Sequence, residues 1–230
     1  MTSAPEAIML FAAGFGTRMG ALTQDLPKPL LEVAGVPLVD HALNLIDQPS
    51  IKTRVVNLHY KGALLEQHLR DRPVRFSHEY PDILDTGGGL KAALPLLDAD
   101  PVFTMNTDAI WSGPNPLNIL LDQWDPRRMD ALLICVPIEN TVGRIGGGDF
   151  DLTAENEILR GKAFVYGGVQ ILKCESVRNH PEDVFSLNKI WNGMAREGRL
   201  FGARYPGNWC DVGHPEGLKL AETLLSEPHV

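Results

Sequence analysis

A glycine-rich turn with two nearby cations is the first place where this chain could bind a polyphosphate. The apolar segment 8–13 runs directly into Gly14 and Gly16, Arg18 follows at once, and Lys28 stands between two prolines. Glycine lets backbone N–H groups approach an oxyanion because no Cβ is in the way, and cations neutralise its charge. The pattern therefore predicts a phosphate site at the carboxyl end of a buried parallel strand.

Two aspartates could bind a divalent cation near this phosphate site. Asp108 comes directly after an apolar strand-like segment, and Asp211 lies much later in the chain, between Trp209 and Gly213. A carboxylate at the carboxyl end of a central parallel strand faces the ligand crevice, and its hard oxygens suit Mg²⁺ beside substrate phosphates. Aspartate is also common at helix N-caps, so a purely structural role stays open for both residues.

Alternating strand-like and helix-like segments position these residues. The apolar patterns predict strands over residues 8–13, 54–58, 74–78, 102–106 and 131–136, and helices over residues 38–47, 61–71, 89–97 and 116–124. Such alternation with short connections predicts an α/β fold, a Rossmann-like and mostly parallel sheet flanked by helices on both faces. Ligands bind such sheets beyond the carboxyl ends of the strands, where the glycine turn and Asp108 are expected.

The second half of the chain is predicted to be richer in strands. Strands are expected over residues 146–152, 162–172 and 200–204, a polar turn near 155–157, and helices over residues 185–197 and 215–226. No linker separates the halves. We therefore predict a single domain over residues 1–230, with a nucleotide-binding half at about 1–135 and a small β-rich half at about 136–230.

Composition excludes several classes of protein. The net charge of −8 argues against a nucleic-acid or anionic-membrane partner, because those surfaces need basic patches. The widely spaced cysteines, Cys135, Cys174 and Cys210, predict reduced thiols and neither disulfides nor a zinc site. The N-terminus lacks the basic region of a signal peptide, which favours a cytoplasmic protein. We expect either a monomer or a small homo-oligomer.

Residues 10–19 and 27–30 resemble the N-terminal signature of the sugar-1-phosphate nucleotidylyltransferases. That signature reads L-A-A-G-x-G-T-R-[ML] followed by K-P-[ML], and the chain departs from it only at Phe11. The segment is neither a Walker loop nor a dinucleotide fingerprint, which need other residues at these positions. Residues 209–215 are similar to a second family motif, W-x-D-x-G-[TH]-[PF].

The resemblance implies a reaction in which a sugar-1-phosphate and a nucleoside triphosphate give a nucleotide sugar and pyrophosphate. It implies nucleotide contacts from Ala12, Ala13, Gly14, Gly16 and Thr17, catalytic roles for Arg18 and Lys28, and a Mg²⁺ cofactor held by Asp108 and Asp211. The attacking phosphate oxygen is already anionic at pH 7, so no general base is required. Catalysis is then expected from positioning and charge neutralisation.

The run from Asp85 to Leu90 holds three successive glycines before a predicted helix. Glycines there let a flat ring lie against the backbone, although a flexible hinge is an alternative. The family contacts the nucleobase with the equivalent loop, which implies nucleotide binding by Thr86, Gly87 and Gly88. This form of the loop resembles the branch that activates N-acetylmuramate-1-phosphate, or a related hexose-1-phosphate, with UTP.

The sugar side is implied by the resemblance to include Asn106, Gly148, Tyr166 and Gly167. Arg144 fits either a contact to the sugar phosphate or a solvated loop. The family's E-K-P-like run is missing, so either Glu155 or Glu157 could be the sugar-contacting glutamate. Alternatives are the same chemistry with dTTP and glucose-1-phosphate, GTP and mannose-1-phosphate, or CTP and phosphocholine, and a non-catalytic sugar-nucleotide-binding regulatory protein.

Overall fold

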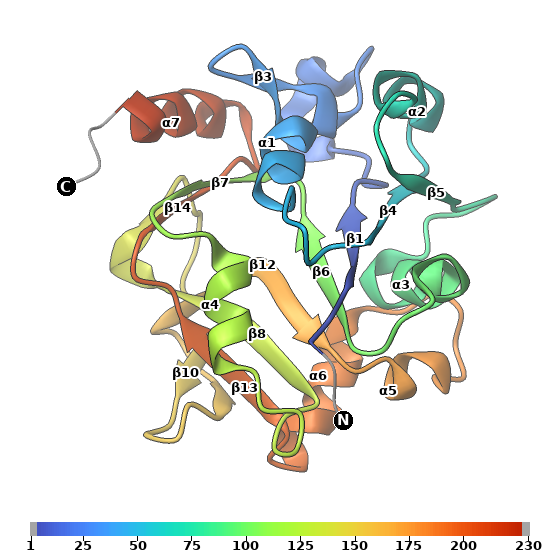
Figure 1. The fold of residues 1–230 in the computed structure, drawn as a ribbon. Helices are drawn as coiled ribbons and strands as arrows, with labels where there is room; N and C mark the ends of the chain where they lie inside the picture. Colours follow the sequence, from blue (N-terminus) through green and yellow to red (C-terminus); the bar gives the residue numbers. More distant parts are fainter. Residues whose placement is uncertain (1–3, 227–230) are drawn as a thin grey trace.

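A nine-stranded sheet forms the centre of the molecule, whose computed structural model describes residues 4–226 (Figure 1). Seven strands follow the order β11-β10-β12-β6-β1-β4-β5, and β8 and β13 continue the sheet from β12. The strands are β1 (Ala7–Phe11), β4 (Thr53–Leu58), β5 (Arg75–His78), β6 (Val102–Asn106), β8 (Ala131–Pro137), β10 (Phe150–Leu152), β11 (Ile158–Arg160), β12 (Phe164–Leu172) and β13 (Leu200–Arg204).

The direction of the strands confirms the predicted mostly parallel sheet and shows that it is mixed. β1 pairs in parallel with both β4 and β6, β4 with β5, and β8 with β13. β12 runs antiparallel to β6 and to β8, so it joins two groups of strands that point the same way. The carboxyl ends of β1, β4 and β6 therefore meet at one edge of the sheet.

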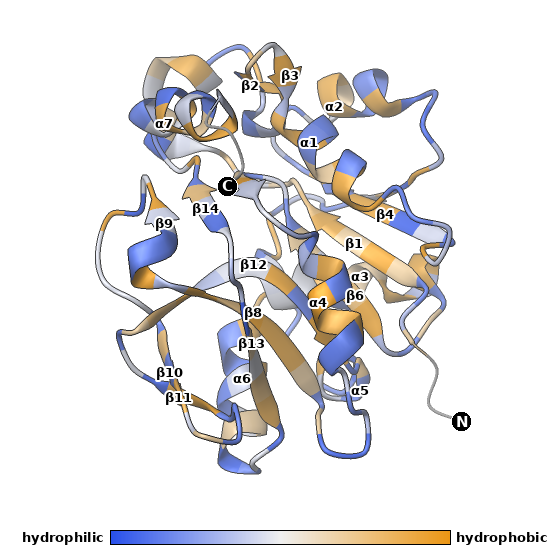
Figure 2. Ribbon diagram, turned by 60° about the vertical axis from the view of Figure 1, so that its left-hand side comes forward, coloured by the Kyte–Doolittle hydropathy of each residue, from blue (hydrophilic) through white to orange (hydrophobic). Residues whose placement is uncertain are grey.

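Helices bury both faces of this sheet. Ile8 and Leu10 of β1 belong to one apolar cluster, and Ala7 and Met9 belong to the other, because side chains alternate along a strand. The first cluster includes residues of α1 (Leu38–Leu45), α2 (Gly62–Leu69) and α4 (Pro116–Gln123), and the second includes residues of α3 (Asp85–Leu97), α5 (Glu175–Arg178) and α6 (Leu187–Arg196). Burial on both sides explains the continuous apolar runs of the central strands, which are orange in Figure 2.

Two smaller sheets lie outside the central one. β7 (Ala109–Ser112), β14 (Asn208–Asp211) and β9 (Thr141–Val142) form a three-stranded sheet, and β2 (Glu32–Val33) pairs with β3 (Val36–Pro37). The last helix, α7 (Pro215–Ser226), packs against β14 and β2 with its own small apolar cluster. These short strands escaped the sequence patterns because two to four residues carry too little periodicity.

Three sequence-based expectations need correction or stay open. Only Phe150–Leu152 of the expected strand 146–152 is a strand, and the polar turn leads into β11, which was not predicted. α3 begins at Asp85, so the glycine run lies inside the helix and not before it. Strands from both predicted halves share one sheet, and the expected boundary at residue 135 falls inside β8. The single domain over residues 1–230 stays a prediction.

None of the helices within residues 4–226 is long and apolar enough to cross a membrane.

Candidate active site

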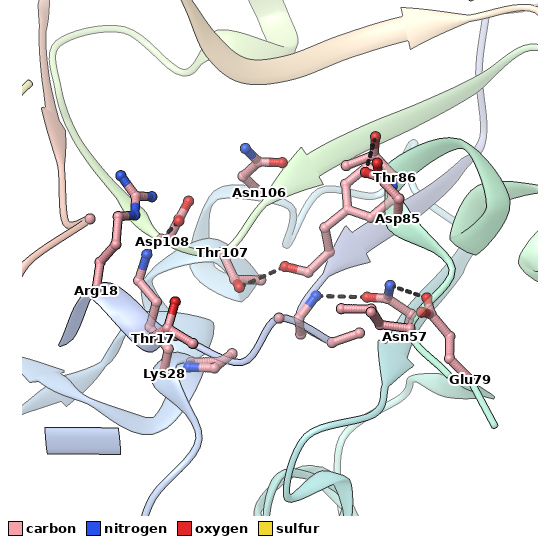
Figure 3. A pocket seen from close by; sticks show the side chains of 18 residues that line it. Thr17, Arg18, Lys28, Asn57, Glu79, Asp85, Thr86, Asn106, Thr107 and Asp108 are labelled. Atoms are coloured by element: carbon pink, nitrogen blue, oxygen red, sulfur yellow. Dashed lines mark hydrogen bonds and ion pairs between the residues drawn. The ribbon is translucent and has the colours of Figure 1, made fainter. Parts of the chain in front are cut away.

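A cavity of about 310 Å³ lies beyond the carboxyl ends of β1, β4 and β6 (Figure 3). It is lined by Phe11, Ala12, Ala13, Gly14, Gly16, Thr17, Arg18, Lys28, Pro29, Asn57, Glu79, Ile83, Asp85, Thr86, Asn106, Thr107, Asp108 and Gly213. The structure therefore brings together most of the predicted nucleotide-binding residues, both predicted catalytic cations and one of the two aspartates.

The turn after β1 is shaped by Gly16. Its φ is +64°, and a Cβ there would lie 3.0 Å from the Cβ of Lys28 and 3.0 Å from Cγ2 of Thr23. The short 3-10 helix Thr17–Thr23, which carries Arg18, begins directly after it, and the Thr23 hydroxyl donates to the Gly16 carbonyl at 3.1 Å. Glycine at this position therefore lets the chain turn tightly enough to place Arg18 and Lys28 on one cavity wall.

Lys28 forms an ion pair with Asp108 across that wall. The Lys28 Nζ atom lies 2.5 Å from Oδ2 of Asp108, and the lysine side chain is only 12% exposed. Thr107 donates its hydroxyl to the Phe11 carbonyl at 2.8 Å, which ties the ends of β6 and β1 together. β7 follows Asp108 directly, so this aspartate is not a helix N-cap.

The three-stranded sheet brings Asp211 beside Asp108. β14 pairs antiparallel with β7 so that Asp211 stands opposite Ala109, and the Val212 N–H donates to the Asp108 carbonyl at 3.0 Å. Asp211 is the last residue of β14, and α7 begins only at Pro215, so Asp211 is not an N-cap either. Both aspartates are thus fixed by strand pairing.

The electrostatics of this pair favour a bound cation. Burial raises the pKa of Asp211, and the negative charge of Asp108 raises it further, while Lys28, Arg18 and Arg144 act in the opposite direction. Two hard carboxylates beside a phosphate-sized cavity fit Mg²⁺, which commonly takes one or two carboxylates and completes its shell with substrate oxygens and water. Within residues 4–226, no three His, Cys, Asp or Glu side chains cluster as a self-sufficient metal site.

Gly213 allows the Arg18 guanidinium and the Asp211 carboxylate to approach each other. A Cβ at Gly213 would lie 2.9 Å from Oδ1 of Asp211 and 3.0 Å from Nη1 of Arg18. Gly213 lines the cavity, whereas Asp211 stands just behind it. The absence of a side chain at this position therefore keeps Asp211 and Arg18 next to the same space.

Asn57 and Glu79 line the cavity and were missed by the sequence analysis. Asn57 Oδ1 accepts from the Ala12 N–H at 2.7 Å, and its Nδ2 donates to Oε1 of Glu79 at 2.7 Å. Oε2 of Glu79 accepts from the Leu84 N–H at 2.7 Å. Figure 3 shows the bonds from Ala12 to Asn57 and from Asn57 to Glu79, and the bond from Leu84 extends this chain to the segment before α3. A buried asparagine inside the apolar strand β4 was the available sequence signal.

Gly87 and Gly88 do not border this cavity, so their contacts with the nucleotide stay a prediction. Their N–H groups donate to the Phe185 carbonyl at 2.8 and 3.1 Å. A Cβ at Gly88 would lie 2.0 Å from the carbonyl oxygen of Asp183. These glycines therefore let α3 pack against the segment before α6. Of Thr86, Gly87 and Gly88, only Thr86 borders the cavity.

A second cavity of about 240 Å³ adjoins the first. The two share Phe11, Asp85, Thr86 and Asn106, and the second is also lined by Asp149, Phe150, Arg160, Tyr166, Ser186, Leu187, Asn188 and Trp191. Of the four predicted sugar-side residues, Asn106 and Tyr166 line it. Burial raises the pKa of Tyr166 far above its ordinary value, so this phenol stays neutral.

Two of the four predicted sugar-side residues do not line the second cavity, and their roles stay predictions. Gly148 packs against the carbonyl of Lys162, and a Cβ at Gly167 would lie 2.7 Å from the Trp111 ring, so neither glycine borders the second cavity. Glu155 and Glu157 line neither cavity. Arg144 is not a solvated loop residue, because its Nη2 donates to Oδ1 of Asp149 at 3.0 Å and its Nε is buried.

Residues 8–144 match the MobA-like NTP transferase domain. The chain belongs to this family. It is 39% identical, over 99% of its own length and all of the relative's, to N-acetylmuramate alpha-1-phosphate uridylyltransferase of Caulobacter vibrioides. A protein of the same name from Neisseria meningitidis serogroup B is 32% identical over 94% of this chain and 96% of that protein. The expected class of enzyme, a nucleotidyltransferase, is confirmed.

Solved structures agree with the fold at low sequence identity. HddC from Yersinia pseudotuberculosis complexed with GMP-PN matches with a TM-score of 0.78 and 21% identity, over 96% of this chain and all of that one. A putative glucose-1-phosphate thymidylyltransferase from Bacillus anthracis matches with a TM-score of 0.79 and 18% identity, over 99% of this chain and 97% of that one. These likenesses support the arrangement of sheet and helices.

We expect Asp211→Asn to stabilise the metal-free protein at neutral pH while abolishing most activity. The folded protein holds the Asp211 proton to a higher pH than the unfolded chain, whose value is near 3.8, so ionisation of Asp211 lowers stability as the pH rises above that value. Asparagine cannot ionise, so the substitution removes the loss of stability that ionisation of Asp211 causes. Thermal unfolding without Mg²⁺ should give a larger rise in Tm at pH 7.5 than at pH 4.5. An equal or smaller change in Tm at pH 7.5 would contradict the raised pKa of Asp211, which burial and the charge of Asp108 cause.

We expect Glu79→Ala to lower the free energy of unfolding by about 1–3 kcal/mol and to weaken nucleotide binding. The change leaves the buried Asn57 amide and the Leu84 N–H without their acceptor, and loosens the turn at Ala12. Urea unfolding and nucleotide titration measure the two effects. Glu66→Ala is the matched control, because Glu66 is an exposed carboxylate in a long 3.8 Å pair with His78.

Proposed function

We propose that this protein transfers a nucleotidyl group from UTP to N-acetylmuramate-1-phosphate, releasing pyrophosphate in a Mg²⁺-dependent reaction. The observation that carries the reaction class is the cluster at the first cavity, where Lys28 pairs with Asp108 at 2.5 Å and Asp211 and Arg18 stand beside it. The choice of substrates rests on the near full-length similarity to the uridylyltransferases of Caulobacter vibrioides and Neisseria meningitidis.

The two adjoining cavities divide the substrates. The first is lined by the glycine turn, both cations and Asp108, with Asp211 next to Gly213, and so takes the triphosphate and its nucleoside. The second takes the sugar, and Thr86 and Asn106, which border both, stand where the sugar phosphate meets the nucleotide. Open space beside Gly14, where a Cβ would have no neighbour within 4 Å, lets phosphate oxygens approach the backbone.

The chain supplies charge neutralisation where the reaction needs it. An oxygen of the sugar phosphate attacks the α-phosphorus, the new P–O bond forms as the bond to the bridging oxygen breaks, and pyrophosphate leaves. Lys28 neutralises the α-phosphate or the sugar phosphate, and Arg18 neutralises the departing pyrophosphate. The nucleophile is already an oxyanion, so no residue needs to remove a proton.

Asp108 and Asp211 are the residues that would hold Mg²⁺. When bound, the ion would supply positive charge to the phosphate oxygens and help to align them. Lys28 compensates the charge of Asp108 in the metal-free protein and keeps that carboxylate oriented toward the cavity. The two carboxylates are thus placed before any ligand binds, which limits reorganisation during the reaction.

Pyrophosphate release tests the function directly. Purified protein with Mg²⁺ is mixed with each pair from a panel of UTP, dTTP, GTP and CTP against N-acetylmuramate-1-phosphate, N-acetylglucosamine-1-phosphate, glucose-1-phosphate, mannose-1-phosphate and phosphocholine. We expect the highest kcat/KM with UTP and N-acetylmuramate-1-phosphate. A different best pair would replace the substrates and keep the reaction class, whereas no release from any pair favours a non-catalytic binding protein.

We expect Lys28→Ala to lower kcat by about 100- to 1000-fold, equivalent to about 3–4 kcal/mol of barrier, because a largely buried cation at the phosphates is lost. Lys52→Ala is the matched control, since Lys52 also pairs with a carboxylate, Glu6, but is 66% exposed and remote from the cavity. Turnover is measured as pyrophosphate release, with Tm as a check on folding. Near-normal turnover by a folded Lys28→Ala protein would contradict the assignment.

A further inference from the structure

We propose that Arg160 binds a carboxylate on the sugar substrate and so selects an acidic sugar-1-phosphate. This inference rests on the proposed function and adds to it the group that distinguishes one sugar from another. N-acetylmuramate carries a lactyl carboxylate that N-acetylglucosamine lacks, so the two sugars differ by the feature that an arginine recognises best.

The Arg160 side chain is held at the second cavity by neutral groups. Its Nη2 donates to Oδ1 of Asn188 and to Oδ1 of Asn192, both at 2.8 Å. These asparagines stand one helical turn apart on α6, so both side chains reach the same side of that helix. The guanidinium carbon also lies 5.1 Å from the centre of the Phe150 ring, which forms part of the same cavity wall. The side chain is thus oriented without losing its charge.

Arg160 has no carboxylate partner among residues 4–226. It contacts two amides and an aromatic ring, and its Nε and Nη1 donors have no acceptor among residues 4–226. Arg160 is exposed to solvent. A charged guanidinium that is positioned but unpaired, with donors still available, is suited to a carboxylate that arrives with the ligand.

The other charged groups of the second cavity are already engaged. Asp149 accepts from Nη2 of Arg144 and from the Tyr166 N–H, each at 3.0 Å. Asp85 accepts from the Thr86 N–H at 2.5 Å. Among the described residues that line this cavity, Arg160 is the only cation. Asp149 and Asp85 therefore already accept hydrogen bonds from this chain. An acidic substituent on the sugar would bind most favourably at Arg160.

Arg160→Gln tests the inference by its effect on selectivity. We expect kcat/KM for N-acetylmuramate-1-phosphate to fall by about 10-fold or more, because a charge-assisted interaction with the lactyl carboxylate is lost. The kcat/KM for N-acetylglucosamine-1-phosphate should change by less than about 3-fold, since that sugar has no carboxylate to lose. Arg160→Lys should keep part of the preference because it keeps the positive charge.

Arg196→Gln is the matched control. Arg196 also lies on α6 and donates from Nε to the Asn192 carbonyl at 3.1 Å, but it does not line the second cavity. The Arg196→Gln variant should prefer N-acetylmuramate-1-phosphate over N-acetylglucosamine-1-phosphate to the same degree as the wild-type enzyme. Equal losses on both sugars in Arg160→Gln, or unchanged selectivity, would overturn the role of Arg160.

The wild-type enzyme provides a test that no variant's folding can obscure. Wild-type kcat/KM is compared between N-acetylmuramate-1-phosphate and its lactyl methyl ester, which keeps the bulk of the substituent and removes its charge. We expect the free acid to be favoured by about 10-fold or more. Equal rates would overturn the inference and leave the reaction class intact, whereas absence of transfer with every sugar phosphate would overturn the proposed function itself.

Discussion

Two carboxylates held side by side are the constraint around which this active site is built. Pairing of β14 with β7 leaves Asp108 and Asp211 next to each other at the edge of a cavity, where burial and the charge of Asp108 both raise the pKa of Asp211. Lys28 and Arg18 offset that repulsion from the opposite side. The arrangement costs stability in the free protein, and under the proposed function a bound cation and phosphates would offset that cost.

The rest of the fold serves to hold this arrangement and to place a sugar beside it. The Asn57–Glu79 bonds couple the glycine turn to the segment that leads into α3, so the nucleotide cavity keeps its shape through buried hydrogen bonds. The reversed strand β12 continues the sheet past β6 and contributes Tyr166 to the second cavity. One continuous sheet therefore sets the distance between the two substrates.

Local sequence was a reliable guide where periodicity or side-chain chemistry acts over a few residues. The strand Val102–Asn106, the strand Leu200–Arg204 and the helix Pro215–Ser226 have the boundaries that their patterns predict. The run Gly87–Gly89 misled the prediction, because glycine disfavours helices in isolation. Here α3 needs glycine where Gly87 and Gly88 pack against residues 183–185 and Gly89 packs against Glu79 and Asn57. Packing overrode propensity at that point.

The amino-acid sequence alone predicted the α/β fold, because apolar periodicity is encoded in neighbouring positions. The resemblance of its short motifs to the sugar-1-phosphate nucleotidylyltransferases predicted the class of enzyme, with Arg18, Lys28, Asp108 and Asp211 as the charged residues of its site. Tertiary structure decided which groups meet. The pairing of Asp108 with Lys28, the Asn57–Glu79 bonds and the asparagines that hold Arg160 all join residues far apart in the chain. Strand pairing and helix packing create these contacts, and no local pattern records them.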